Sequence, residues 1–491
     1  GDREIGDGEA VSGLYTGEQT DRARTLYAVS PYPVPLPLVR AGLTVKRACA
    51  RANRAGGYLC EQRAAAIEEA VTFFLGLDDE ALRAHFDLDA YQGGAGTATN
   101  MNLNEAIAAR ARTGADPGSG CGTRGEPDAL AVDPLDHVNL HQSTNDVMPT
   151  ALRLMLLDML EPAEREIEEL QTEIQRGERD YASVLKTART QLRDATVITA
   201  GQQFATWAGT LGRDRWRLFK ARERLKEVNL GGTAVGTGLG APRDYVLGVV
   251  RELGRLTRHP VTRADNPVEA TSNYDQLLEA MEAVNVAAAG LMRIAGDLRL
   301  LASGPGGGIG EIVLPAPVKG SSIMAGKVNP VRAEAVVQAA ERIAANHGLL
   351  TRLCGRSELE LNAFLPAIAH TAWESLSMLT GAARSLRELV AGVEVDSARC
   401  AANLEESYAR VVALLPLFGY AACERLIEDA RERGTALSAY LVEVLGMDQA
   451  DVEELLSARN LSRLGYDAER YAELERRYAD RAGRIPEKRD G

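Results

Sequence analysis

The most informative stretch of the chain is residues 320–330, which read GSSIMAGKVNP. It holds two glycines that allow sharp turns, two adjacent serines that can form hydrogen bonds, and a lysine and an asparagine that can hold a carboxylate. A solvated Gly/Ser linker would share the first of these features. The apolar residues Ile323, Met324 and Val328 are not typical of such a linker. The pattern therefore favours a functional loop held by a rigid scaffold.

Composition narrows the class of protein. The chain has 491 residues, enough for two or three domains and a large core. Aromatic residues make up only 5% of the sequence, and helix-forming residues dominate. The net charge is −13 with basic residues spread throughout, so we expect no nucleic-acid surface. No apolar run approaches the length of a membrane span, so we expect no membrane partner.

Cysteines and histidines give no metal pattern. The six cysteines are scattered without metal-ligand spacing, so we predict reduced thiols in a cytoplasmic protein. Among the histidines only His137 and His141 lie close together, and no third ligand stands near them in sequence. We therefore predict neither a metal nor any other cofactor.

Long apolar stripes organise the rest of the chain. From Pro149 apolar residues recur at helical spacing for several turns, with Pro162 inside the run as a candidate kink. Similar stripes predict helices at about 202–228, 274–301, 330–350 and 365–389. Helices of this length bury their stripes in a bundle, and wide stripes favour further burial between subunits.

The segments outside these stripes are shorter. Four prolines between residues 31 and 37 predict an extended arm in the first 40 residues. We expect helical structure at 39–75 and 102–112, polar loops at 91–100 and 137–146, and an exposed loop at 113–130. After about Glu405 a smaller, charged helical segment is expected, with breaks at Gly419, Gly434 and Gly446.

Polar loops thus stand at far-apart points of one helical chain: Gly96-Thr97, Ser143-Thr144-Asn145, Thr190-Gln191 and residues 320–330. Together they resemble the aspartase/fumarase superfamily, whose signature is similar to the last of them. The segments 231–238 and 297–305 match the same family. The resemblance covers about residues 38–461.

The resemblance implies an all-α, three-domain fold with a central bundle of long helices. Its domains would be an N-terminal, mostly helical domain at 1–145, the central bundle at 146–404 and a small C-terminal helical domain at 405–491. It also implies a homotetramer whose active sites combine loops of three subunits, with a small dicarboxylate as the substrate.

The implied chemistry removes a proton from the carbon beside a carboxylate, which requires a base and preorganised hydrogen-bond donors. By resemblance Ser321 is the catalytic base. A serine serves as a base only if backbone N–H groups or an ammonium stabilise its alkoxide. The resemblance also implies substrate-binding roles for Thr97, Ser143, Thr144, Asn145, Thr190, Gln191, Ser322, Met324, Lys327 and Asn329.

Within this set the roles differ. Thr97, Ser143, Thr144 and Ser322 would hold the carboxylate that accumulates charge, whereas Thr190, Lys327 and Asn329 would hold the other. Asn145 and Gln191 would face the leaving group, and Glu334 would support the site by orienting Gln191. Each residue also has an ordinary interpretation: Thr190 as a turn residue, Glu334 on a solvated helix face, and Ser143 as a helix cap.

Several positions depart from the family pattern and bear on the reaction. Gln191 stands where many members carry histidine, and Ala95 resembles aspartases more than fumarases. In contrast, residues 418–422 look closer to fumarases. Ala325 replaces the usual proline, and His141 replaces the usual serine. Arg193 adds positive charge near Gln191, either as a group facing the leaving group or as a solvated turn residue.

We therefore predict a lyase that eliminates a substituent from a 2-substituted succinate to give fumarate. C–N cleavage is favoured, releasing ammonia from aspartate or nitrite from nitrosuccinate. The alternatives are fumarase-like hydration and dehydration of malate, and a non-catalytic scaffold of the same superfamily.

Overall fold

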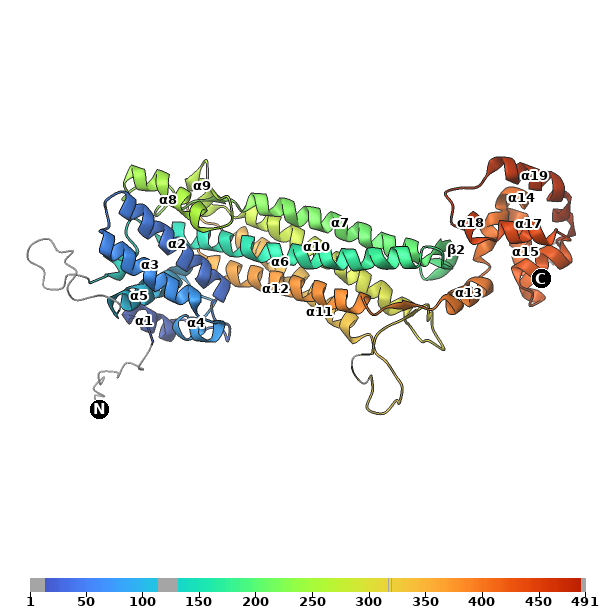
Figure 1. The fold of residues 1–491 in the computed structure, drawn as a ribbon, viewed down its shortest axis with the longest axis horizontal. Coiled ribbons are helices and arrows are strands. Elements are labelled where there is room, and N and C mark those ends of the chain that lie inside the picture. The colour runs from blue at the N-terminus through green and yellow to red at the C-terminus, as the bar shows by residue number, and fades with distance from the viewer. Residues whose placement is uncertain (1–13, 114–130, 317, 319, 487–491) are drawn as a thin grey trace, which may run out of the picture. The chain divides into compact units, whose positions relative to one another are not determined.

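The computed structural model describes residues 14–113, 131–316, 318 and 320–486. Its ribbon is mainly helical (Figure 1), which confirms the predicted helical class. The chain forms two compact units. The first unit contains Gly1–Arg165, Asp214–Ala289 and Ala339–Gly381, and the second contains Glu166–Arg213, Gly290–Gln338 and Ala382–Gly491. The division into three domains stays a prediction.

The long helices contribute residues to both units. They are α6 (Thr144–Asp180), α7 (Ala200–Arg224), α10 (Asp275–Leu301), α11 (Val331–Cys354) and α12 (Leu365–Val390). The stripe expected at 274–301 explains why α10 forms, because Leu277, Met281, Val284, Leu291 and Leu298 recur at helical spacing and are all buried. Burial of each such side chain stabilises the fold by about 1.5–3 kcal/mol.

Helix α6 is longer than its sequence suggests. Pro149 and Pro162 both lie inside it, yet the helix continues from Thr144 to Asp180. Leu152 and Leu160, which lie between the two prolines, are buried. Packing of this apolar face outweighs the hydrogen bonds that the two prolines cannot donate.

The first unit holds the N-terminal helices and two helices from the middle of the chain. They are α1 (Glu18–Leu26), α2 (Leu36–Ala55), α3 (Glu61–Gly76), α4 (Asp79–His85), α5 (Thr97–Thr113), α8 (Arg243–Leu256) and α9 (Pro267–Ser272). Short 3-10 and π turns lie at Gly94–Gly96 and Pro134–Val138, and the parallel strands β3 (Glu227–Val228) and β4 (Thr262–Arg263) pair with each other. Figure 1 shows α2, α3 and α5 side by side.

Two predictions for this region need correction. Among the described residues, the expected extended arm contains a helix, α1, with non-helical residues at 14–17 and between α1 and α2. The helical structure expected at 39–75 is divided into two helices, α2 and α3, because the chain turns after Ala55 and Gly57 takes a φ of 76°. The predicted loop at 113–130 falls almost wholly outside the described residues.

The second unit contains a hairpin and the C-terminal helices. Strands β1 (Leu185–Thr190) and β2 (Arg193–Thr199) are antiparallel, as are β5 (Ile312–Val313) and β6 (Glu394–Val395). The helices that follow are α13 (Ser397–Glu406), α14 (Leu415–Phe418), α15 (Tyr420–Glu432), α16 (Leu437–Ala439), α17 (Gln449–Leu455), α18 (Ala458–Leu461) and α19 (Ala468–Tyr478). Further short 3-10 and π turns lie at Ala409–Leu414, Tyr440–Val444 and Ala479–Arg484.

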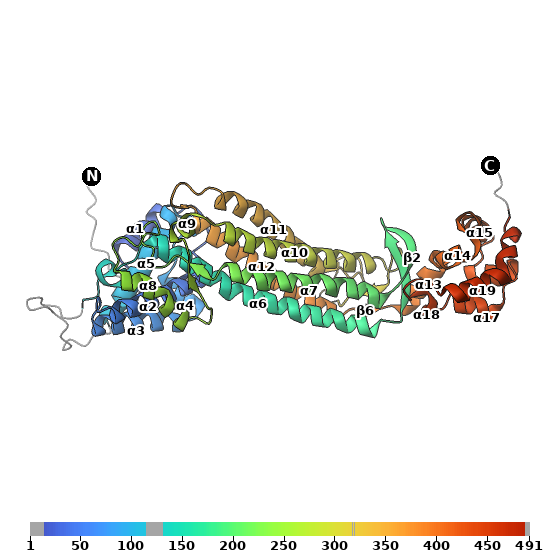
Figure 2. The same ribbon diagram turned by 90° about the horizontal axis from the view of Figure 1, so that it is seen from above.

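These C-terminal helices form a core of their own. Figure 2 shows α14, α15, α17 and α19 gathered together, and Leu426, Leu441 and Leu474 belong to one buried apolar cluster. The predicted breaks at Gly419, Gly434 and Gly446 are confirmed, since all three glycines have positive φ angles.

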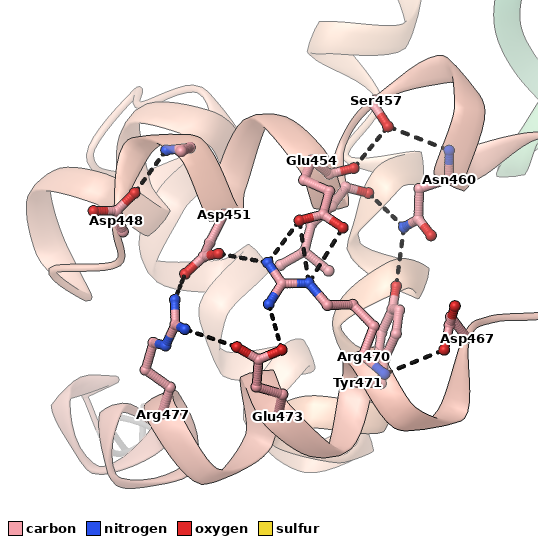
Figure 3. Close-up of polar contacts among 12 residues, drawn as sticks. Asp448, Asp451, Glu454, Ser457, Asn460, Asp467, Arg470, Tyr471, Glu473 and Arg477 are labelled. Atoms are coloured by element: carbon pink, nitrogen blue, oxygen red, sulfur yellow. Dashed lines mark hydrogen bonds and ion pairs between the residues drawn. The ribbon is translucent and has the colours of Figure 1, made fainter.

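An ion-pair network joins α17 to α19 (Figure 3). Asp451 is buried and accepts hydrogen bonds from Arg470 at 2.7 Å, Arg477 at 2.6 Å and Tyr478 at 2.5 Å. Burial raises the pKa of Asp451, but these donors outweigh it, so the pKa lies below its ordinary value. The carboxylate therefore stays ionised at neutral pH and ties the two helices together.

The cysteines are only partly as predicted. Cys49, Cys354, Cys400 and Cys423 are free, buried thiols. Cys60 is disulfide-bonded, so the prediction of a reduced thiol is wrong for this residue. Cys121 lies outside the described residues. No helix in the described part of the chain is long and apolar enough to cross a membrane.

Candidate active site

The loop at 320–330 is closed at its two ends. The side-chain amide of Asn329 donates to the carbonyl oxygen of Gly320 at 2.6 Å. A Cβ atom at Gly320 would lie 2.0 Å from the carbonyl oxygen of Lys327, so only glycine fits this crossing. The tip of the loop is exposed, with Ile323 at 88%. The loop is thus fixed where it meets α11 and open where a ligand would contact it.

Ser321 sits at the start of this loop with donors aimed at its hydroxyl. Its Oγ accepts hydrogen bonds from the backbone N–H groups of Ile323 at 3.2 Å and Met324 at 2.9 Å. Such paired backbone donors stabilise negative charge on oxygen. The geometry therefore provides part of what a serine alkoxide requires.

An open cavity of about 910 Å³ lies beside the loop. Lys327 and Asn329, both predicted to bind a carboxylate, line it together with Arg299 and Glu334. Arg299 and Glu334 form an ion pair at 3.9 Å. The predicted role of Glu334 toward Gln191 stays a prediction. Asp396 also lines the cavity, so its two cationic side chains are accompanied by two carboxylates. Lys327 stands outside the Arg299–Glu334 ion pair and is the cation that suits an anionic ligand.

Thr190 and Gln191 lie at the turn of the β1–β2 hairpin. Thr190 ends β1 opposite Arg193, and both are exposed together with Gln191. Gln191 and Leu192 have positive φ angles of 53° and 61°. The turn interpretation of Thr190 and the solvated interpretation of Arg193 both agree with this placement. Neither observation assigns a ligand to the turn.

A buried ion cluster anchors the base of this hairpin. Glu311 is fully buried and pairs with Lys186 at 3.0 Å and Arg189 at 2.9 Å. Asn403 on α13 donates to the same carboxylate at 3.1 Å. Burial raises the pKa of Glu311, but hydrogen bonding from Arg189 and the charge of Lys186 outweigh it and lower the pKa overall. The carboxylate is therefore held as an anion between the hairpin and α13.

In the first unit the segment 143–145 opens α6. The Ser143 Oγ accepts from the N–H of Asn145 at 3.2 Å, which confirms that Ser143 caps the helix. The side-chain amide of Asn145 donates to the carbonyl of Ala234 at 2.8 Å. The Thr144 Oγ1 accepts from Asn100 on α5 at 3.2 Å. The segment is thereby joined to the loop at 231–234 and to α5.

Thr97 is the first residue of α5. Its hydroxyl donates to the carbonyl of Gly94 at 2.7 Å, and its side chain is exposed. The preceding Ala95 takes a φ of 56°, in the left-handed region that favours glycine. The chain therefore turns tightly just before Thr97 and presents that hydroxyl at the start of a helix.

Backbone strain is concentrated in these loops. Among the described residues, non-glycine positions with positive φ are Ala95, His141, Gln191, Leu192, Thr233, Leu359 and Tyr408. All but the last two lie in or beside the segments predicted to form the site. Such conformations cost about 1–3 kcal/mol each and gather at functional sites. This independent observation supports the location of the site.

The predicted site residues are divided between the two units. Thr97, Ser143, Thr144 and Asn145 belong to the first unit, and Thr190, Gln191, Ser321, Ser322, Met324, Lys327, Asn329 and Glu334 belong to the second. In the first unit a hydrogen bond from Asn100 joins Thr144 to α5, the helix that Thr97 begins. In the second unit the residues lie on the hairpin turn, on the loop at 320–330 and at the start of α11. Across the described residues, no cluster of three or more His, Cys, Asp or Glu side chains is arranged to hold a metal.

Sequence reasoning missed three charged residues beneath these loops: Lys46, Asp146 and Glu311, all buried. A signal for the first was present, because Lys46 interrupts the apolar stripe of α2. Asp146 directly follows the polar segment 143–145, but adjacency alone does not reveal burial. Glu311 carries no local signal, since its ion-pair partners Lys186 and Arg189 lie more than a hundred residues away in the sequence.

Comparison with known proteins shows the family of this chain. The model of a family described as Lyase matches residues 12–345. The chain belongs to the aspartase/fumarase superfamily. It is 39% identical to an aspartate ammonia-lyase of Pseudomonas aeruginosa, over 93% of this chain and 95% of the relative. It is 35% identical to fumarate hydratase class II 2 of Bradyrhizobium diazoefficiens, with the same coverage of 93% and 95%.

Solved structures agree with this membership. A fumarate lyase:delta crystallin from Brucella melitensis, solved with bound cobalt, is similar to this chain with a TM-score of 0.85 and 37% sequence identity. The match covers 92% of this chain and 96% of that one. Members of the family thus include both fumarate hydratases and aspartate ammonia-lyases, so membership establishes an enzyme family of lyases without deciding which bond is broken.

Proposed function

We propose that this superfamily member is a lyase that removes a proton and a substituent from opposite faces of a 2-substituted succinate. The Ser321 alkoxide takes the proton from the carbon beside one carboxylate, and the electron pair forms the double bond as the bond to the substituent breaks. The products are fumarate and the protonated or anionic leaving group. The observation that carries this proposal is the pair of backbone N–H groups on the Ser321 Oγ.

Substrate recognition follows from the cations beside the loop. Lys327 and Asn329 line the same cavity, and an ammonium with an amide can hold one carboxylate of the substrate. Thr97, Ser143, Thr144 and Ser322 offer hydroxyls to the other carboxylate, on which charge accumulates. Met324 would pack against the bound substrate.

Within this reaction class we favour C–N cleavage. Gln191 and Ala95 are the residues that support it. Gln191 stands where many members carry histidine, and Ala95 resembles aspartases more than fumarases. Gln191 carries both an amide oxygen and an amide N–H₂, so it suits a protonated amine or an anionic nitrite. Dehydration of malate is the second candidate, supported by residues 418–422 and by the similarity to a fumarate hydratase.

A substrate panel tests the assignment. We expect fumarate to appear, by its ultraviolet absorbance, from aspartate or nitrosuccinate faster than from malate. The purified full chain would be assayed with all three at equal concentration, with succinate as the unreactive control. Faster release from malate would overturn the C–N assignment, and no release from any substrate would favour the non-catalytic scaffold.

We also propose a homotetramer that acts in the cytoplasm. The predicted site residues are shared between two units, and single chains expose apolar side chains such as Leu239, Ile323 and Trp216. Burial of those side chains between subunits would account for them. Light scattering is expected to give four times the chain mass, and a stable, active monomer would contradict the proposal.

A further inference from the structure

Two oppositely charged residues lie buried beneath the Ser143–Asn145 segment. Asp146 is 0% exposed, and so is Lys46. Buried charges destabilise a fold unless hydrogen bonds and partners compensate them. The contacts of both residues are therefore informative, because they show what these costly groups hold in place.

Asp146 joins two loops through backbone donors. Its Oδ1 accepts from the N–H of Ser143 at 3.0 Å, and its Oδ2 accepts from the N–H groups of Gly231 and Thr233, also at 3.0 Å. Thr233 has a positive φ of 55°, so its loop depends on such outside support. One carboxylate thus fixes the segment that opens α6 against the loop at 231–234.

Lys46 holds the residues that come just before this segment in the sequence. Its ammonium donates to the side-chain oxygens of Asn139 and Gln142, each at 2.9 Å. The Asn139 oxygen also accepts from Asn100 at 3.3 Å, and Asn100 donates in turn to Thr144 at 3.2 Å. A continuous set of hydrogen bonds therefore connects the buried ammonium to a hydroxyl predicted to bind substrate.

We propose that Asp146 and Lys46 are positioning residues that set the placement of Ser143, Thr144 and Asn145 for the reaction. This inference rests on the proposed function, because the segment they hold is assigned to the substrate there. Neither residue touches the substrate. A misplacement of about 1 Å by such supporting groups lowers activity roughly 100-fold, which sets the expected size of the effect.

The pair also makes activity depend on pH. Burial raises the pKa of Asp146 to about 6, against the lowering effect of its N–H donors and of Lys46. Burial lowers the pKa of Lys46 to about 8. Below pH 6 Asp146 gains a proton and loses an acceptor for one of the loop N–H groups. We expect kcat/KM to fall as the pH drops through this value.

Other titratable groups near Asp146 do not share this behaviour. Burial raises the pKa of Cys49 on α2 to about 12 and raises that of Tyr245 on α8 well above its ordinary value, so both stay neutral. His141, in the same loop, contacts Asn53 and Tyr245, and burial lowers its pKa below the ordinary 6.5. Lys46 is thus the cation that faces Asp146, and His141 is the group from which an acid limb must be distinguished.

The test compares Asp146→Asn and Lys46→Met with Asp158→Asn, a matched control on the same helix whose carboxylate pairs with His259 near the surface. We expect Asp146→Asn to lower kcat/KM roughly 100-fold and to abolish the acid limb near pH 6. Lys46→Met should move that limb to higher pH, because a cation that lowers the Asp146 pKa is gone. Asp158→Asn should leave both unchanged.

A second readout does not need turnover. Hydrogen exchange in the full-length protein should accelerate at residues 143–146 and 231–234 in Asp146→Asn, but not in Asp158→Asn. Unchanged exchange and unchanged kcat/KM would overturn the proposal, as would an acid limb that persists in Asp146→Asn and so belongs to His141. If Asp146→Asn does not fold, the shift of the limb in Lys46→Met decides. Failure of the proposed function is recognised separately, by the absence of turnover in the unmodified chain.

Discussion

Ser321→Ala is expected to lower kcat by about 10²–10⁴-fold or more, since a positioned base contributes this much to proton transfer. Binding of unreactive succinate should persist, because the change removes a proton acceptor and leaves Lys327 and Asn329 in place. The measurements are initial rates of fumarate formation and the Kd of succinate by calorimetry. A loss of turnover with retained binding separates a base from a binding residue.

Two variants of neighbouring residues serve as comparisons for Ser321→Ala. Ser322→Ala removes the adjacent hydroxyl and should reduce kcat/KM only roughly 10- to 100-fold, the value of one hydrogen bond to a charged group. Lys327→Ala should weaken succinate binding and turnover together, because the ammonium acts on the bound carboxylate in every state. Substantial turnover in Ser321→Ala would mean that another group takes the proton.

The long helices could be predicted because their signal is local. The stripe expected at 274–301 became α10 at Asp275–Leu301, and the stripe at 365–389 became α12 at Leu365–Val390. Apolar spacing within a helix is visible in any short window of sequence. Helix α1 was missed because its surface is largely polar, so prolines farther along the chain dominated the pattern.

The candidate loops could be recognised in the sequence, whereas the residues beneath them could not. Ser321 and the other loop residues form contiguous motifs, and the chemistry proposed for them follows from residue type. The hairpin β1–β2 was not predicted, since strand pairing depends on register and on partners elsewhere in the chain. Lys46 and Asp146 show the same limit, because Lys46 binds Asn139 and Gln142 and Asp146 binds Gly231 and Thr233, all far away in the sequence.

The second prediction with a large expected effect concerns Glu311, which anchors the β1–β2 hairpin. Glu311 lies between Lys186 and Arg189 on β1 and receives a hydrogen bond from Asn403. The side chains of Glu311 and Lys186 are 0% and 5% exposed, so water cannot replace the carboxylate easily. Removing one partner of a buried ion pair leaves an uncompensated charge and destabilises a protein by about 3–5 kcal/mol.

Glu311→Gln is therefore expected to destabilise the second unit by about that amount and to loosen the hairpin that carries Thr190 and Gln191. The measurement is the thermal or urea midpoint of the full chain together with hydrogen exchange in residues 185–199. Glu394→Gln is the matched control, because Glu394 is an exposed glutamate on the strand β6 beside β5. It should leave both readouts unchanged.

A double variant separates the lost ion pair from a general packing defect. Lys186→Met in the Glu311→Gln background removes the stranded cation, so part of the lost stability should return. If the cluster instead contributes nothing, Glu311→Gln will match Glu394→Gln and the double variant will be no better than either. Recovery of stability without recovery of the KM for substrate would show that the cluster holds the hairpin in its working geometry as well as folded. Glu311, Lys186 and Arg189 together connect β1 to the segment that leads into β5.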